Sequence, residues 1–91
     1  MDTMITLPRL IKLPDVAAAT ALRSTSIYAC IKAGTLPPPI KLTARSSAWV
    51  ESEIAAINAA RIAGKSDDEI RELVRELVAQ RAAPAQTLHR A

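Results

Sequence analysis

Four consecutive side chains of this sequence have the chemistry for recognising nucleic acid. Arg23, Ser24, Thr25 and Ser26 stand where a helix is predicted to begin. An arginine can donate two hydrogen bonds to the O6 and N7 atoms of guanine, and hydroxyl groups can bond base edges or phosphates. Free N–H groups at a helix start also attract phosphate. The segment therefore predicts a helix that enters the major groove of duplex DNA with its first turn.

Two further residues of this helix extend the hypothesis. Tyr28 lies about one turn further along, where its hydroxyl could reach a phosphate, and Lys32 at the far end suits the opposite strand. Both features have structural alternatives. Tyr28 could be a half-buried packing residue, and the Ser-Thr-Ser run could cap the helix. Capping and DNA contact can coexist in one segment.

A second basic segment is a predicted β-hairpin over residues 40–50, with Arg45 at its tip. A short β-ribbon beside the first helix could place this guanidinium group in the minor groove, whose potential is most negative where the groove is narrow. Lys41 on the ribbon would meet a phosphate, and Thr43 and Ser46 flank the tip. A hairpin that directly follows a helix-turn-helix forms a wing.

The elements that position these residues follow from helix start and stop signals. Pro14 favours a first helix over residues 15–20, and residues 21–23 are predicted to form a tight turn. The second helix then runs to about Ala33 and stops at Gly34. Two short helices joined by about three residues are typical of a helix-turn-helix.

The chain between the second and third helices is predicted to be extended. Residues 37–39 are three prolines, which cannot continue a helix. The strand candidates of the hairpin are 40–42 and 48–50, and Trp49 is expected to anchor the core rather than to stack on a base. The short apolar segment before the first helix is expected to be extended or to pack beneath that helix; it comprises Leu10, Ile11 and Leu13.

A third helix is predicted to begin at Glu51 and Glu53 and to end at Gly64. The two acids suit the positive end of the helix dipole and are expected to lie on the solvated surface. One face of this helix is traced by Ile54, Ile57, Arg61 and Ile62.

A fourth helix follows from a capping box formed by Ser66 and Glu69, and Pro84 ends it. Its apolar stripe has helical spacing and consists of Ile70, Leu73, Val74, Leu77 and Val78. The stripe must be buried somewhere. It could complete the core of its own chain, or it could form a partner surface that gives a dimer or a head-to-tail series along DNA.

Charge is unevenly distributed along the 91 residues. The net charge is +3, but six basic residues stand against one acid between Arg9 and Arg45, whereas four arginines stand against five acids from Ser66 onward. This asymmetry favours one surface that meets a polyanion, although a solvated surface that leans basic would look the same.

Catalysis is not predicted from this sequence. Phosphate-binding glycine loops, dinucleotide-binding loops and zinc-protease motifs are absent. Cys30 lies on the apolar side of the second helix, and its only histidine partner, His89, falls in a tail expected to fray. We therefore expect no enzyme, no disulfide, no metal and no cofactor, with a thiol enzyme as the weakest alternative. The sequence also shows no signal peptide and no membrane segment, so we expect a protein of the reducing cytoplasm.

Several motifs together resemble the AlpA family of phage-type regulators. They are R-L-I-x-L-P from Arg9, the Ile27-Tyr28 pair, G-x-x-P from Gly34, and Trp49 shortly before E-S-E. The resemblance covers residues 9–63. Three positions differ from the family pattern: Ala21 stands where glycine is usual in the turn, Arg23 is displaced by one position, and Ala29 replaces a basic residue. If residue 21 needs a positive φ, alanine there costs about 1 kcal/mol.

The resemblance implies a small winged helix-turn-helix protein, related to MerR-like DNA-binding domains and to phage excisionases. Family members regulate transcription on mobile elements or act as recombination directionality factors. It also implies double-stranded DNA as the partner, with integrase or RNA polymerase as further partners, on the nucleoid in the bacterial cytoplasm. An adaptor or antirepressor that uses the fourth helix without touching DNA is the alternative.

The predicted fold class is thus mostly α with a small β-hairpin wing, a winged helix-turn-helix with an additional C-terminal amphipathic helix. We expect four segments: a lead-in over residues 1–8, the DNA-binding domain over 9–63, the amphipathic helix over 64–83 and a flexible tail over 84–91.

Overall fold

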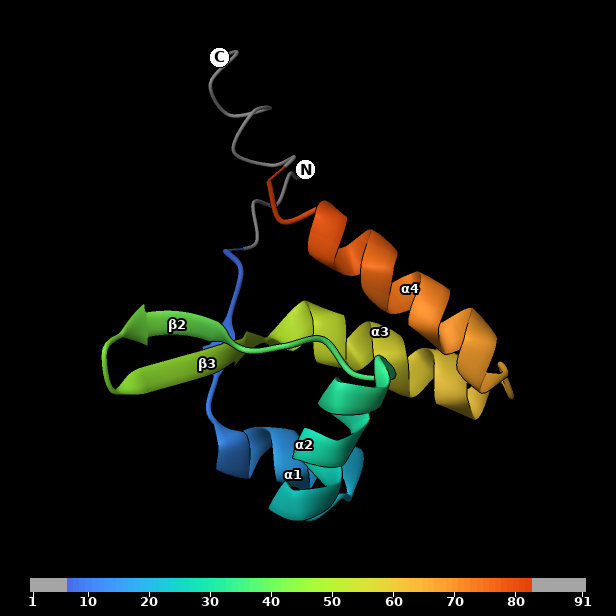
Figure 1. Ribbon diagram of the computed structural model, residues 1–91, viewed down its shortest axis with the longest axis horizontal. Helices are drawn as coiled ribbons and strands as arrows, with labels where there is room; N and C mark the ends of the chain where they lie inside the picture. Colours follow the sequence, from blue (N-terminus) through green and yellow to red (C-terminus); the bar gives the residue numbers. More distant parts are fainter. Residues whose placement is uncertain (1–6, 83–91) are drawn as a thin grey trace, which may run out of the picture.

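The computed structural model describes residues 7–82 and confirms the predicted fold class. Four helices accompany a small three-stranded antiparallel sheet, in the arrangement of a winged helix-turn-helix followed by a C-terminal helix (Figure 1). In chain order the elements are β1 (Leu10–Ile11), α1 (Leu13–Thr20), α2 (Ser24–Ala33), β2 (Ile40–Thr43), β3 (Ser46–Val50), α3 (Glu51–Ile62) and α4 (Asp67–Ala79).

The first helix begins two residues earlier than predicted, at Leu13. Its N-cap is Lys12, whose backbone N–H donates to Oδ2 of Asp15 at 3.4 Å. Leu13 and Pro14 therefore lie in the first turn of the helix. The helix ends at Thr20, and its C-cap Ala21 has a left-handed backbone with φ 62°. The turn therefore does need a positive φ at the position where alanine replaces glycine.

The second helix ends at Ala33 as predicted, but its N-cap is a different residue from those considered. Its N-cap is Arg23, and no side chain caps it, so the prediction that a serine or threonine of the Ser-Thr-Ser run is the N-cap is wrong. These residues instead lie inside the first helical turn. At the other end, Gly34 has φ 85° and ends α2 as predicted.

The sheet has the order β1-β3-β2, and the short β1 adds a strand to the predicted hairpin. Leu10 pairs with Val50, and Ile11 pairs with Trp49. Ile11 is also buried in the core, so this segment is extended and packed at once. β2 and β3 are each longer than predicted and form the wing, which we define as residues 40–50. The wing projects from the helical body (Figure 1).

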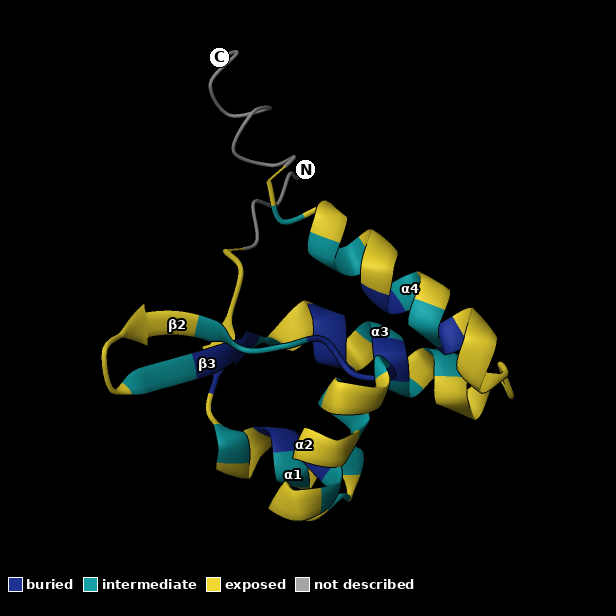
Figure 2. Cartoon of the chain, viewed as in Figure 1, coloured by how far each residue is buried: buried dark blue, intermediate teal, exposed yellow. Residues whose placement is uncertain are grey.

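The core lies where β3, α1, α2, α3 and α4 meet, as the burial pattern in Figure 2 shows. Trp49 is 2% exposed, which confirms it as the bulky anchor. Of the face predicted for α3, Ile54 and Ile57 are buried, whereas Arg61 and Ile62 at the end of the helix are exposed. Ile62 is 87% exposed.

The fourth helix packs on the core of its own chain. Ile70 and Val74 are buried, and the other three residues of the apolar stripe are partly buried against the same cluster; they are Leu73, Leu77 and Val78. The prediction of a partner surface is therefore wrong for Ile70 and Val74, because folding on α3 already removes them from water. The capping box of Ser66 and Glu69 is present as predicted. Pro84, His89 and the predicted tail lie outside the described residues.

Two arginines that follow or belong to α4 fasten it to the rest of the chain. Arg71 Nε donates to the Ala33 carbonyl at the C-terminal end of α2, at 2.9 Å. Arg81 donates to both carboxylate oxygens of Glu53, at 2.7 and 2.9 Å, and to the Pro38 carbonyl at 2.8 Å. Glu53 is buried, so the prediction that it lies on the solvated surface is wrong. Arg81, which follows α4, is the residue that pairs with the buried Glu53 carboxylate.

Candidate DNA-binding surface

The polar residues predicted on α2 are accessible. Five of the six are exposed and Ser26 is half-buried; the exposed ones are Arg23, Ser24, Thr25, Tyr28 and Lys32. Because no side chain caps α2 and its first turn holds no acid, the positive end of the helix dipole is not offset by a neighbouring carboxylate. Lys32 stands in the last turn, where a cation suits the negative end of the dipole.

Tyr28 packs against the core and is also exposed to solvent. Its ring centroid lies 6.4 Å from that of Trp49, at a tilt of 58°. Such a tilted arrangement is favourable for an aromatic pair. The residue is nevertheless 52% exposed, so it packs against the core anchor and still presents much of its surface to solvent.

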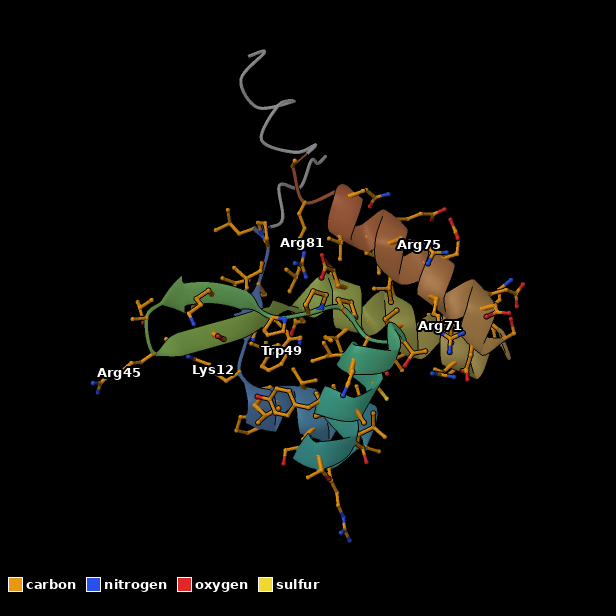
Figure 3. The ribbon with its side chains drawn as sticks, viewed as in Figure 1. Lys12, Arg45, Trp49, Arg71, Arg75 and Arg81 are labelled. Carbon is orange, nitrogen blue, oxygen red and sulfur yellow. The ribbon has the colours of Figure 1, made fainter. Side chains whose placement is uncertain are left out.

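The wing turn presents Arg45. Its backbone N–H donates to the Thr43 hydroxyl at 3.3 Å, which closes the turn. The register shifts by one residue between Lys41, which pairs with Ser47, and Thr43, which pairs with Ser46. Such a bulge twists the ribbon and re-aims the side chains beyond it. Figure 3 shows Arg45 pointing outward from the tip, away from the body of the molecule.

One residue of this surface was missed by the sequence analysis. Lys12 Nζ donates to the Ser46 hydroxyl at 2.6 Å, so the residue before α1 touches the beginning of β3. In Figure 3 the Lys12 side chain extends along β3 toward the wing tip. The two residues are 34 positions apart, and nothing in their local spacing signals the contact.

Ion pairing separates the basic residues into two groups. Within residues 7–82, five arginines pair with carboxylates: Arg9, Arg61, Arg71, Arg75 and Arg81. In the same range, six basic residues form no ion pair: Lys12, Arg23, Lys32, Lys41, Arg45 and Lys65. Apart from Lys65, these residues lie on α2 or at its N-cap, on the wing, or, in the case of Lys12, in contact with the wing. The unpaired positive charge is therefore concentrated on these elements.

The start of α2 and the wing tip are two separate projections. α1 contacts both α2 and β3, and so connects them. α4 packs against α3 and carries the paired arginines Arg71 and Arg75 (Figure 3). The arrangement presents a basic helix start and a basic ribbon from a common support.

Residues 7–82 show no assembled catalytic or metal-binding site. Cys30 is half-buried and lines an apolar hollow of about 380 Å³ with Leu22, Leu36 and Ile57. Its only possible histidine partner, His89, lies outside the described range. Residues 7–82 contain no cluster of three or more histidine, cysteine or acidic side chains that could hold a metal ion. None of their helices is long and apolar enough to span a bilayer.

Comparison with known proteins identifies relatives over the same part of the chain. The family model described as Prophage CP4-57 regulatory protein (AlpA) matches residues 9–61. The uncharacterized protein ORF88 of Enterobacteria phage P4 is 38% identical over 61 residues, which cover 67% of this chain and 69% of that protein. No solved structure matches the chain significantly. The family match spans the helix-turn-helix, the wing and nearly all of α3, and it ends before α4.

Proposed function

This chain belongs to the AlpA family of prophage regulatory proteins, and from that premise we propose that it binds double-stranded DNA sequence-specifically on a mobile element. α2 enters the major groove with its first turn, and the wing contacts the adjacent minor groove or backbone. The contacts come from Arg23, Ser24, Thr25, Ser26, Tyr28 and Lys32 of α2 and from Lys41, Thr43, Arg45 and Ser46 of the wing.

The observation that carries this proposal is the concentration of unpaired cations on α2 and the wing. A carboxylate partner would have to be displaced before an arginine could bind phosphate, and that exchange would consume much of the gain. Arg23 and Arg45 have no such partner among the described residues, and both are exposed. Phosphate contacts by such side chains release condensed counterions, which drives association.

The family supports a proposal for the biological role. We propose that the protein regulates transcription on its element, as an activator, or directs recombination toward excision, or does both. Integrase and RNA polymerase are the partners that these two roles imply, and the bacterial nucleoid is the place of action. Since one copy offers few phosphate contacts, several copies along the DNA would bind far more tightly than one.

Mobility-shift titrations with single variants test DNA binding. Arg23→Ala removes the side chain proposed to read a guanine, and each such bidentate contact contributes about 1–3 kcal/mol. We expect a loss of affinity of about fivefold to 150-fold, and a loss of about tenfold for Arg45→Ala. Arg75→Ala is the matched control, because Arg75 is exposed but paired with Glu72 on α4. Wild-type affinity in both Arg23→Ala and Arg45→Ala would refute the assignment.

Selection of bound sequences from a random duplex pool distinguishes the two roles. Recovered sites that map to a promoter of the element support regulation. Recovered sites that map beside an attachment site support a directionality factor, and an excision assay with the cognate integrase then tests the role directly. A chain that enriches no sequence would contradict sequence-specific binding.

A further inference from the structure

We propose that Lys12, which precedes α1, is an additional DNA-contacting residue of the wing. Its ammonium group is held by Ser46 and neutralises a backbone phosphate next to the one that the wing tip meets. The inference rests on the proposed DNA binding and adds to that surface a residue from a different part of the chain.

The position of Lys12 is determined by the short strand before it. Leu10 and Ile11 pair with Val50 and Trp49 at the inner end of β3. The chain then leaves the sheet to begin α1, and the Lys12 side chain continues along β3 (Figure 3). Its Nζ reaches the Ser46 hydroxyl at 2.6 Å. Because Ser46 directly follows Arg45, two positive charges are placed on the outer half of the wing.

The charge of Lys12 remains available to a ligand. Lys12 is exposed and forms no ion pair within residues 7–82. The nearby Asp15 carboxylate accepts a hydrogen bond from the Lys12 backbone N–H and forms no ion pair with the Lys12 ammonium group. An ammonium group has three donors, and a neutral hydroxyl takes one of them without offsetting the charge. The other donors can bond phosphate oxygens.

The bond to Ser46 also prepares the side chain for binding. A lysine loses considerable rotamer freedom when it is immobilised on a ligand. Here part of that loss occurs in the free protein, because the hydroxyl already holds Nζ at the wing. Preorganisation of this kind raises affinity by lowering the cost of ordering on binding.

Salt-dependent binding of three variants tests the inference. The probe is a fluorescein-labelled duplex of mixed sequence, about 24 base pairs long, titrated by anisotropy between about 50 and 200 mM salt. Lys12→Ala removes charge and hydrogen bond, Lys12→Gln keeps a donor for Ser46 without the charge, and Lys12→Arg keeps the charge. Lys65→Ala is the control, since Lys65 is likewise exposed and unpaired within residues 7–82 but lies between α3 and α4.

We expect both uncharged variants to reduce the slope of log affinity against log salt by about 0.9, which corresponds to about eightfold weaker binding at 0.1 M salt relative to a 1 M reference. Lys12→Arg and Lys65→Ala should keep the wild-type slope. A wild-type slope in Lys12→Gln would overturn the inference, since Lys12 would then only hold the wing in place. Equal losses in Lys12→Ala and Lys65→Ala would also overturn it. Failure of the wild-type chain to bind the duplex at all would refute the proposed function as well.

Discussion

The α2–wing region, comprising α2, residues 40–50 and Lys12, differs from the α3–α4 region in how it uses charge. In the α2–wing region the cations are exposed and none is ion-paired within residues 7–82. In the α3–α4 region Arg61, Arg71, Arg75 and Arg81 each pair with a carboxylate.

Both regions contribute to the apolar core, through Ile27 and Trp49 in one and through the apolar stripe of α4 in the other. The α2–wing region differs in that Tyr28 stays half exposed and that Ala21, just before α2, has a left-handed backbone. Paired charges and buried side chains stabilise the fold, but they leave little for a ligand to gain. The paired arginines of α3 and α4 therefore stabilise the fold, whereas the exposed cations of α2 and the wing are the ones on which the proposed DNA binding depends.

Truncation of a buried α4 residue should cause the largest loss of stability. A small loss would contradict the contrast drawn between the two regions. Ile70 is fully buried, so Ile70→Ala should lower the free energy of unfolding by about 2–5 kcal/mol. Urea denaturation followed by Trp49 fluorescence measures this, with Ile70→Val at about 0.5–1.5 kcal/mol as the milder variant if the alanine chain does not fold. The control is Ile62→Ala, because Ile62 is exposed and should change stability by less than about 0.5 kcal/mol. Equal losses in both would contradict a structural role for α4.

Removal of the buried ion pair should have the next largest effect. Arg81→Ala leaves Glu53 buried without its partner and the Pro38 carbonyl without its donor. We expect the free energy of unfolding to fall by about 2–3 kcal/mol. This is at or below the loss usual when one partner of a buried ion pair is removed, because the Arg81 side chain is still 24% exposed.

The hydrogen bond to Glu53 raises the pKa of Arg81, so its positive charge persists throughout the pH range in which the protein can be studied. Arg75→Ala is the matched control. Its pair with Glu72 is exposed and should contribute about 0–1 kcal/mol. Thermal or urea unfolding that ranks the two variants the other way would show that burial does not distinguish these pairs.

The turn before α2 offers a test in the opposite direction. Ala21 has φ 62°, a conformation that is unfavourable for alanine but not for glycine, so Ala21→Gly should stabilise the protein by about 0.5–1 kcal/mol.

Gly34→Ala is the opposite substitution and should destabilise the protein. Its φ is 85° while an added Cβ would meet only ordinary contacts with Arg71, so backbone conformation alone should cost about 1 kcal/mol. A destabilised Ala21→Gly chain would show that this turn is not strained.

The smallest effect concerns the capping box of α4 and depends on pH. The backbone N–H of Ser66 donates to the Glu69 carboxylate and is the main reason that its pKa lies below the ordinary value of 4.5. A lowered pKa stabilises the fold above that ordinary value, and the contribution disappears as the pH falls through the lowered value. Glu69→Gln keeps an acceptor and does not titrate. The melting temperatures of the two proteins should therefore differ at neutral pH and converge in acid; a pH-independent difference would contradict this.

Much of the fold was predictable because its signals are local. The Ser66–Glu69 capping box, the stop at Gly34 and the helical spacing of the α4 stripe each depend on residues within a few turns of one another. The start of α2 was less predictable, because several hydroxyl residues compete for the N-cap and the chain uses Arg23 instead. The hairpin could be located, but its third strand could not, because a two-residue segment has no recognisable period.

The candidate site was only partly predictable for a related reason. The candidate residues of α2 and the wing could be identified from their residue types and from their positions in the predicted helix and hairpin. Lys12 does not, because its role depends on a hydroxyl 34 residues away. Glu53 was misplaced on the surface, because acids at a helix start are usually solvated and its partner, Arg81, lies 28 residues further along.

The sequence by itself determined the helix-turn-helix, the ribbon with Arg45 at its tip and the excess of positive charge in the first half of the chain. Periodicity, caps and composition are local properties, so they can be recognised without knowing which distant residues come into contact. Only the tertiary structure decided which cations of residues 7–82 form no ion pair there, that α4 completes its own core, and that Lys12 reaches the wing. These outcomes depend on which distant groups come within a few ångströms, since burial and ion pairing are properties of packed surfaces rather than of a chain.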